Sequence, residues 1–227
     1  MSYPMTVRDY QIRCNSLALP GSTVLTVDGM NGPNTRKQIE LVRRQLGLRD
    51  VKEMFDPSGI TRVHWHWTAS TYDVTWDVRS HYNDVFDEHG HEFDGGAPAH
   101  LQASYDWRNK IGVSHTFNAN TGAIGLAVAA MAGASANWGA STVDPGKYPM
   151  TQEQIDAMLK KTVEYCRAFD IKPSPWTTLT HAEVQTNINI RQKGKWDIRC
   201  LPENHKQLLS EKAAGDLLRK RMMEKFW

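Results

Sequence analysis

Cysteine is scarce in this sequence, with only three in 227 residues. Cys14, Cys166 and Cys200 lie far apart along the chain, and an odd number of cysteines cannot pair completely. The sequence therefore lacks the cysteine framework of a small disulfide-stabilised domain. We expect the chain to fold in a reducing compartment with its thiols free.

An excess of charge of either sign is also missing. Lys and Arg number 27 against 25 Asp and Glu, which gives a formal net charge of +2. This balance does not support nucleic-acid binding through overall positive charge, so we expect no nucleic-acid partner.

Long apolar runs are absent as well. The most apolar stretch, residues 124–136, is rich in Ala and Gly and is too short to span a bilayer. The first residues lack the basic region and apolar run of a signal peptide. We therefore expect a soluble protein, made in the cytoplasm without a signal peptide. The hydrophobic content of 40% is ordinary for a globular chain.

Turn-forming residues divide the chain into two parts. Asp, Pro, Ser and Gly at positions 56–59 interrupt the sequence between a helical N-terminal part and a part rich in strand formers. We expect a small helical unit over residues 1–56 and a main domain over residues 57–227.

The N-terminal unit contains a turn followed by a helix. Residues 27–35 are dense in turn formers, and apolar side chains at helical spacing follow over residues 36–46. Asn34 or Thr35 could cap this helix, and Gly47 could end it.

The main domain begins with a strand. Residues 60–67 alternate, so that Trp65 and Trp67 share one face and His64 and His66 share the other. A second strand is expected over residues 80–86. A third, over residues 123–130, lacks polar alternation and should be buried on both faces.

Helices are expected between and after these strands. Thr151 and Gln154 resemble a capping box, and a helical apolar face continues to Asp170. Strands interleaved with helices predict an α/β (α+β) fold, in which a central mixed β-sheet is flanked by helices. The C-terminal residues 203–227 predict an amphipathic helix, which either docks on its own domain or makes weak contact with an anionic membrane.

Three side chains at strand ends and in turns suggest a metal site. His66 lies at a strand end, His181 follows a proline-rich turn, and Asp197 lies in a segment of turn formers. Two imidazoles and one carboxylate suit Zn²⁺ and leave a fourth position open for water, as in catalytic zinc sites. Spacing alone does not establish this site, because the three residues are far apart in sequence.

A family resemblance connects these residues. The ordered set resembles the type 2 N-acetylmuramoyl-L-alanine amidases, the superfamily of phage lysozyme-amidases and peptidoglycan recognition proteins, over about residues 60–200. It consists of His66-Trp67-Thr68-Ala69, His81-Tyr82 with Gly90, His115-Thr116 with Asn118, Ile124-Gly125, His181-Ala182-Glu183-Val184 and Lys195-Trp196-Asp197. The resemblance implies the amidase type 2 fold.

The resemblance also implies the metal ligands. The family's first zinc histidine precedes x-Thr/Ser-Ala, which selects His66 and leaves His64 as the substitute. The second histidine matches His181. The third ligand is Asp or Cys in different members, and here the Lys-x-Asp pattern selects Asp197, with Cys200 as the alternative.

Two further residues are implied to act in catalysis. Lys195 matches a lysine beside the scissile carbonyl, where it would stabilise an oxyanion, although a solvated lysine is the alternative. Tyr82 lies eight residues before Gly90, as in members with a catalytic tyrosine, and would orient the attacking water. The alternative is a structural tyrosine with a bonded hydroxyl.

The chain departs from the family pattern at two positions. Asn83 replaces a common histidine, and Ala127 replaces the glutamate that other members use, which leaves Tyr82 or an unidentified base. Glu183 could be a carboxylate behind a metal ligand.

We expect the substrate to be bound by His115, Asn118 and Trp67.

The N-terminal unit has a resemblance of its own. Over residues 26–48 it resembles a small three-helix peptidoglycan-binding module, on Val27-Asp28-Gly29, Gly32, Asn34-Thr35 and Gly47-Leu48. The alternative is a helix and turn packed on the main domain.

Together, these resemblances imply a zinc-dependent amidase that hydrolyses the lactyl–L-Ala bond of peptidoglycan. We expect a monomeric phage endolysin that acts on the cell wall after release from the host cytoplasm. The alternatives are a bacterial cell-wall recycling amidase and a non-catalytic peptidoglycan-binding protein.

Overall fold

A computed structural model of the chain describes residues 5–55 and 58–227. The expected domain junction begins at residues 56–57, which lie outside the described residues. Within the described residues, no helix combines the length and the apolar character needed to cross a bilayer.

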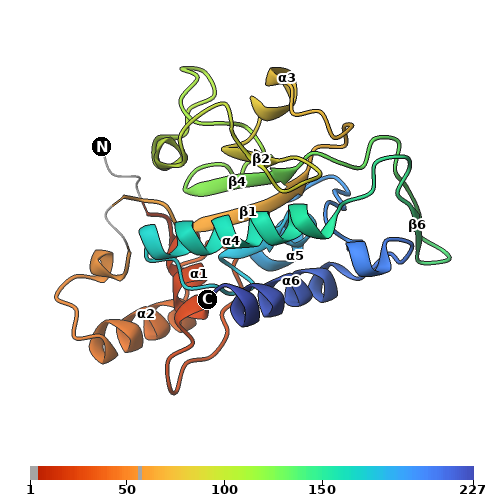
Figure 1. Cartoon of the computed structure of the whole chain (residues 1–227). Helices are drawn as coiled ribbons and strands as arrows, with labels where there is room; N and C mark the ends of the chain where they lie inside the picture. The colour runs from red at the N-terminus through yellow and green to blue at the C-terminus, as the bar shows by residue number, and fades with distance from the viewer. Residues whose placement is uncertain (1–4, 56–57) are drawn as a thin grey trace.

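A five-stranded mixed sheet forms the centre of the fold, as the sequence predicts (Figure 1). Its strands run in the order β3-β2-β4-β1-β7, and all neighbours are parallel except the β2–β3 pair. The strand bounds are β1 Arg62–Trp67, β2 Asp84–Phe86, β3 Glu92–Asp94, β4 Ala123–Val128 and β7 Thr178–Thr180.

Two long helices, α4 (Gln152–Ala168) and α6 (Glu211–Lys225), pack on one face of this sheet. Thr151 and Gln154 form the predicted capping box at the start of α4. Trp65 on β1 points to this face, and its indole N–H donates to Thr162 Oγ1 of α4 at 2.8 Å. Because side chains alternate along a strand, His64 and His66 point to the opposite face.

Strand β4 alternates large and small side chains instead of apolar and polar ones. Its large side chains, Ile124, Leu126 and Val128, join the core beneath α4. The alternate positions, Gly125 and Ala127, are small and lie on the same face as His64 and His66. The face of the sheet that carries His64 and His66, the histidine face, therefore has room for side chains from other segments.

The C-terminal helix α6 docks on its own domain, which is one of the two predicted alternatives. Its Arg219 forms a buried ion pair with Glu183 of α5 (Glu183–Ile188), with 2.7 Å between Nη2 and Oε1. Gly215 allows this approach, because a Cβ atom there would lie about 2.1 Å from Glu183 Oε2. The sequence predicts that this helix begins at residue 203. It begins instead after its N-cap, Ser210, because residues 202–204 form a separate 3-10 turn.

The described part of residues 1–56 is helical, with α1 (Val7–Leu17), α2 (Pro33–Gln45) and the 3-10 helix η1 (Val51–Met54). The prediction that Asn34 or Thr35 caps the second helix is wrong. The helix begins at Pro33, where the missing N–H costs nothing, and Gly32 is its N-cap.

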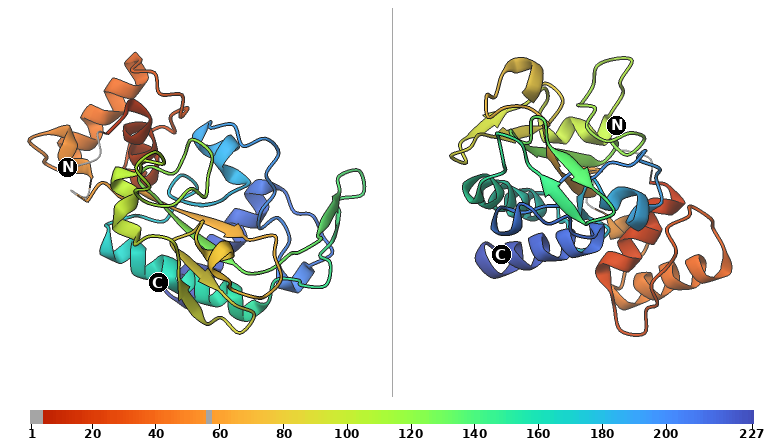
Figure 2. Two further views of the ribbon diagram at one scale, coloured as in Figure 1. Left: turned by 90° about the horizontal axis from the view of Figure 1, so that it is seen from above. Right: turned by 90° about the vertical axis from the view of Figure 1, so that its right-hand side faces the viewer.

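These N-terminal helices share a buried interface with the sheet. Asp9 of α1 and Arg62 of β1 form an ion pair at 3.0 Å, and both side chains are almost fully buried. Ile12 of α1 belongs to the same apolar cluster as Leu179 of β7 and Val184 of α5. The N-terminal helices and the hairpin of β5 (Ser135–Asn137) and β6 (Thr142–Asp144) lie at opposite ends of the molecule (Figures 1 and 2).

The second predicted strand is shorter than expected. The short helix α3 (Trp76–Arg79) and a turn occupy the region before β2, so that Tyr82 lies in the turn and not within a strand. Backbone bonds from the Gly95 and Gly96 N–H groups to the Asn83 and Tyr82 carbonyls hold this turn.

Candidate metal centre

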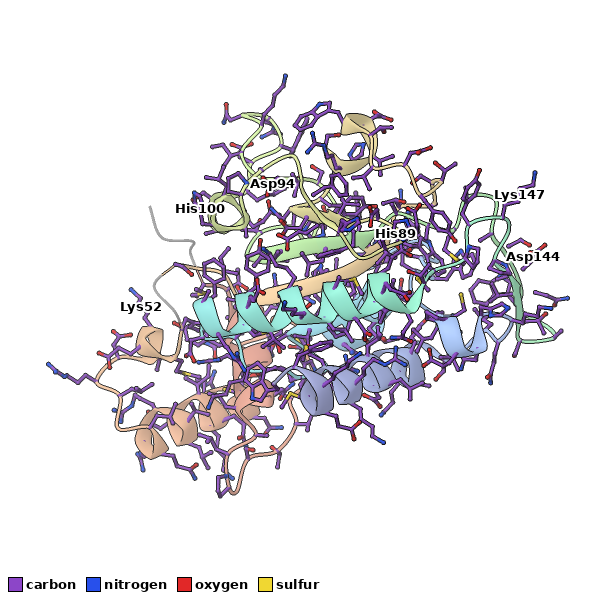
Figure 3. The ribbon with its side chains drawn as sticks, in the orientation of Figure 1. Lys52, His89, Asp94, His100, Asp144 and Lys147 are labelled. Carbon is purple, nitrogen blue, oxygen red and sulfur yellow. The ribbon has the colours of Figure 1, made fainter. Side chains whose placement is uncertain are left out.

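Burial divides the nine histidines into two sets. Five are exposed on the surface, and two of these, His89 and His100, are labelled in Figure 3. The other four are buried, and all of them lie on the histidine face of the sheet or beside it: His64, His66, His115 and His181.

Strand pairing brings His66 and His181 together. In the parallel β1–β7 register Trp65 is opposite Thr180, and the His181 N–H donates to the Trp65 carbonyl at 3.0 Å. His66 and His181 follow these residues by one position each and therefore face the same side. Both lie at the carboxyl end of parallel strands, where ligand sites of α/β sheets usually form.

Asp197 reaches the same point from a loop. The next residue, Ile198, is buried and has a φ of +61°, a conformation that is costly for a β-branched side chain. The preceding Trp196 packs edge-on against Trp67, with 4.6 Å between ring centroids. Core packing on both sides of Asp197 therefore holds its carboxylate next to the two imidazoles.

The three predicted ligands present one atom each to a common point. His66 Nδ1 and His181 Nδ1 are 3.0 Å apart, and Asp197 Oδ2 lies 3.4 Å from the first and 3.2 Å from the second. Ligand atoms of a tetrahedral zinc ion with bonds near 2.0–2.1 Å are about 3.3 Å apart. The triangle of donor atoms thus has the dimensions of one face of such a site, and these residues could hold a metal ion.

Gln192 determines which nitrogen of His181 carries the proton. Gln192 Nε2 donates to the Phe117 and Ile190 carbonyls at 2.9 and 3.1 Å, which leaves Oε1 as an acceptor. His181 Nε2 lies 3.0 Å from this oxygen and donates to it. The Nδ1 lone pair of a neutral His181 therefore faces the triangle.

Glu183 does not have the role that the sequence predicts for it. Its carboxylate accepts from the Thr180 N–H at 3.0 Å and pairs with Arg219, so it anchors α6 and does not bond to His181. His181 lies in the turn before α5, whereas Glu183 is the first residue of that helix and points in a different direction, so the amide of Gln192 takes its place beside His181.

His115 directs the proton of His66 in a similar way. The carbonyl of Ala123 can only accept, so His115 Nε2, 3.0 Å from it, is the donor and its Nδ1 is the acceptor. His66 Nε2 lies 3.1 Å from that Nδ1 and donates to it. Gly125 makes room for this ring, since a Cβ atom there would lie 2.4 Å from His115 Cγ.

The protonation of the triangle favours a bound cation. Burial lowers the pKa of His66 to about 4, so this imidazole is neutral at neutral pH. Two imidazole lone pairs and a carboxylate then converge, an arrangement that a metal ion stabilises.

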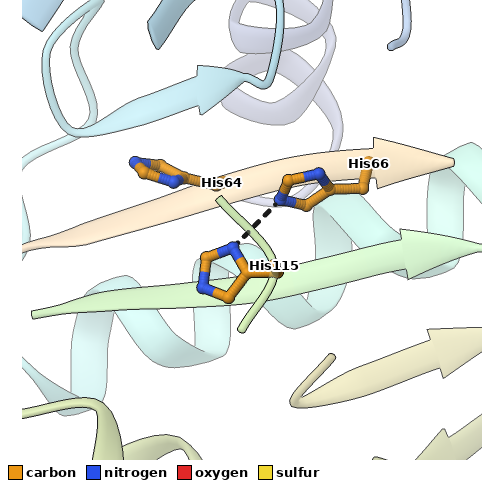
Figure 4. A group of neighbouring side chains, drawn as sticks. All are labelled: His64, His66 and His115. Atoms are coloured by element: carbon orange, nitrogen blue, oxygen red, sulfur yellow. Dashed lines mark hydrogen bonds between the residues drawn. The ribbon is translucent and has the colours of Figure 1, made fainter. Parts of the chain in front are cut away.

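A second group, His64, His66 and His115, could also hold a metal ion by proximity (Figure 4). A hydroxyl lies between its nitrogens, however. Thr116 Oγ1 is 3.0 Å from His64 Nδ1, 2.8 Å from His115 Nδ1 and 3.4 Å from His66 Nε2. The Thr116 hydroxyl thus bonds to the nitrogens that meet at this point without a cation, although Nε2 of His64, on the other side of its ring, is buried without a hydrogen-bond partner among the described residues.

The two alternative ligands lie elsewhere. His64 shares the face of His66, as strand parity predicts, but its Nδ1 bonds to Thr116. Cys200 lies in the core beneath the sheet, and burial raises the pKa of its thiol to about 12, which disfavours the thiolate that metals bind.

Tyr82 and Lys195 lie beside the triangle. The ring centroids of Tyr82 and His66 are 5.4 Å apart, and Ala127 packs against Tyr82. Burial, and after it the charge of Asp197, raises the pKa of Tyr82, which keeps its phenol protonated. Lys195 is exposed, and its charge contributes to the low pKa of His66.

A cavity of about 1020 Å³ opens next to the metal ligands. His181, Gln192 and Lys195 line it, and so do the predicted substrate-binding residues His115 and Asn118. Trp67 does not line it, so the prediction that Trp67 contacts substrate is corrected. It is buried in the core on the opposite side of the strand from His66 and packs against Trp196.

Sequence reasoning missed three residues that organise this site. Gln192 and Thr116 bond to the buried histidines, and Asn120 Oδ1 accepts from the N–H groups of His115 and Thr116 at 3.0 and 2.7 Å. Each is a polar residue in an irregular segment, and no periodic pattern marks such a residue as buried.

Neither the models of known protein families nor the curated proteins include a match to this chain.

Proposed function

We propose that this protein is a zinc-dependent N-acetylmuramoyl-L-alanine amidase, which hydrolyses the lactyl–L-Ala amide bond of peptidoglycan. The observation that carries the proposal is the triangle of His66 Nδ1, His181 Nδ1 and Asp197 Oδ2, with edges of 3.0–3.4 Å beside a large cavity. The order of the ligand segments along the chain, with its family resemblance, supports the choice of substrate.

Zinc is the metal that these donors favour. Two imidazoles and one carboxylate form a borderline set, and three protein ligands leave one position open, as in catalytic zinc sites. A zinc ion held there would act as a Lewis acid and lower the pKa of a coordinated water towards neutrality.

Tyr82 and Lys195 supply the remaining groups. Because its pKa is raised, Tyr82 remains a neutral phenol and acts as a hydrogen-bonding group that orients the attacking water. Lys195 lines the same cavity as His181, and its ammonium would stabilise the negative charge that develops on the carbonyl oxygen. Tyr82 would thus hold the attacking water in position, and Lys195 would stabilise the negative charge on the carbonyl oxygen.

The cavity lining agrees with an anionic substrate. Lys193 and Lys195 line it, and among the described lining residues there is no Asp or Glu. The stem peptide of peptidoglycan carries free carboxylates, and a cavity without acidic side chains admits it without charge repulsion.

We propose that the biological role is lysis of a bacterial host by a phage endolysin. The N-terminal helices would add contacts to the wall, as a peptidoglycan-binding module does. A protein that binds peptidoglycan without cleaving it is the main competing function, and the experiment below separates the two.

The test is digestion of purified peptidoglycan with the zinc-loaded protein, in which new L-alanine amino termini are measured. Chelation and a His181→Ala variant should each abolish their release. New reducing sugar ends without new L-alanine termini would refute amidase activity in favour of a glycosidase. Binding without cleavage would assign the protein to the non-catalytic class.

A further inference from the structure

Two aromatic side chains that line the cavity are exposed. Trp107 and Phe117 are 66% and 58% exposed. Each lacks the stabilisation that burial of a large apolar side chain contributes. Exposed aromatic side chains at the rim of a polar cavity mark a binding surface.

The loop that carries Trp107 is held in place. Asp106 and Ile111 exchange two backbone hydrogen bonds of 3.0 Å, and Asp106 Oδ1 accepts from the Arg108 N–H at 2.9 Å. The Arg108 guanidinium lies 5.3 Å from the Trp107 ring centroid. A tryptophan on an ordered loop loses little conformational entropy when it binds a ligand.

Phe117 is held by the machinery of the metal site. Its carbonyl accepts the 2.9 Å bond from Gln192, the residue that orients His181, and Lys193 Nζ lies 5.3 Å from its ring centroid. The aromatic surface is therefore connected to the candidate metal centre through one buried side chain.

The rest of the lining favours a sugar over an apolar ligand. Besides aromatics, histidines and lysines, the lining contains six residues with hydroxyl or amide groups, and it contains no aliphatic side chain among the described residues: Ser114, Thr116, Asn118, Asn120, Thr121 and Gln192. A pyranose ring has an apolar C–H face that stacks on aromatic rings and a rim of hydroxyl groups that need hydrogen-bond partners. A peptide with apolar side chains would find no aliphatic surface here.

We infer that Trp107 and Phe117 form a stacking surface for the glycan strand of peptidoglycan, and so determine recognition of the sugar and not of the stem peptide. This inference rests on the proposed function for the identity of the glycan. It places the sugar beside Trp107 and Phe117, and the bond to be cleaved beside His181 and Lys195.

The test compares Trp107→Ala, Phe117→Ala and Trp138→Ala in the zinc-loaded full chain. Trp138 is the matched control, because it is 56% exposed and does not line the cavity. Calorimetric titration measures binding to two probes, peptide-free glycan oligosaccharides of alternating N-acetylglucosamine and N-acetylmuramic acid, and free stem peptide. Neither probe contains the scissile bond.

We expect Trp107→Ala and Phe117→Ala each to weaken glycan binding at least about fivefold, with stem-peptide binding and the Trp138→Ala variant unchanged. The inference is overturned if glycan binding does not change, if Trp138→Ala loses as much, or if stem-peptide binding alone declines. Unchanged glycan binding with intact L-alanine release would refute the inference alone. Trp107-dependent glycan binding without L-alanine release would refute the proposed activity alone.

Discussion

Two groups of buried side chains share His66 and differ in what lies at their centre. In the first, Nδ1 of His66 meets Nδ1 of His181 and the carboxylate of Asp197, three groups that could together hold a metal ion. In the second, Nε2 of His66 meets His115 and His64, and the Thr116 hydroxyl lies among the three nitrogens. The same imidazole thus faces a candidate cation site on one side and a hydrogen-bond network on the other.

Proximity of histidines therefore does not by itself define a metal site. The direction of the donated protons distinguishes the two groups. Gln192 and His115 take the N–H protons of His181 and His66 on the outside, so that lone pairs face inwards. In the second group, the Thr116 hydroxyl lies within hydrogen-bonding distance of one nitrogen of each of the three histidines.

The largest expected effect is the loss of a ligand of the first group. Asp197→Ala should lower zinc affinity by more than about 100-fold, because it removes the only charged ligand, whereas outer partners contribute about 10- to 100-fold. Competition with a chromogenic chelator measures this affinity. Cys200→Ser is the control and should retain zinc. If Cys200→Ser loses the metal and Asp197→Ala keeps it, the ligand assignment is reversed.

Removal of the outer acceptor of His181 should have the next largest effect. Gln192→Ala should weaken zinc binding about 10- to 100-fold, because His181 is then free to carry its proton on Nδ1. ¹⁵N chemical shifts of the imidazole in the metal-free protein report the tautomer directly. Gln185→Ala is the control, since Gln185 Oε1 accepts from the Gln192 backbone N–H at 3.0 Å without contacting His181. An unchanged tautomer in Gln192→Ala would refute this role.

A smaller effect is expected at His115. His115→Phe keeps a ring over Gly125 but removes the acceptor of the His66 N–H, and Thr116 Oγ1 at 3.4 Å remains as a partial substitute. We expect about a tenfold loss of zinc affinity, at the low end of the range for outer partners. The matched variant His64→Phe should bind zinc as the parent does, and equal losses in the two variants would contradict the comparison.

The smallest effect on metal binding is expected at the centre of the second group. Thr116→Val should leave the content at one zinc per chain, while unfolding by urea shows a loss of about 1–3 kcal/mol, because buried histidine nitrogens lose the hydroxyl to which they bond. Metal analysis after dialysis measures the content. A rise to two zinc ions per chain would mean that the hydroxyl merely occupies a second metal site.

Local rules predicted much of the fold correctly. The alternation in residues 60–67 placed His64 and His66 on one face, and Thr151 with Gln154 marked the start of α4. Short elements such as β7 and α5 were missed, because three to six residues carry too little periodic signal. The second strand was predicted too long, since the turn at Tyr82 is held by distant glycines.

The candidate site was predicted in part. The family pattern named His66, His181 and Asp197, and the structure brings them together. The same reasoning assigned Glu183 and Trp67 wrongly, because a residue near a ligand in sequence can point into a different layer. Gln192 was missed because its role depends on contacts with Phe117 and Ile190 that no local pattern records.

Local sequence specifies the side-chain chemistry, the faces of β1 and the capping box of α4, because these depend on residues within a few positions of one another. Which side of His66 meets a carboxylate and which meets a hydroxyl depends on the tertiary fold. In a neutral imidazole, the acceptor of the single N–H fixes which nitrogen presents a lone pair, and other segments of the chain supply such acceptors to His66 and His181. Those acceptors come from residues that are 49 positions away from His66 and 11 from His181.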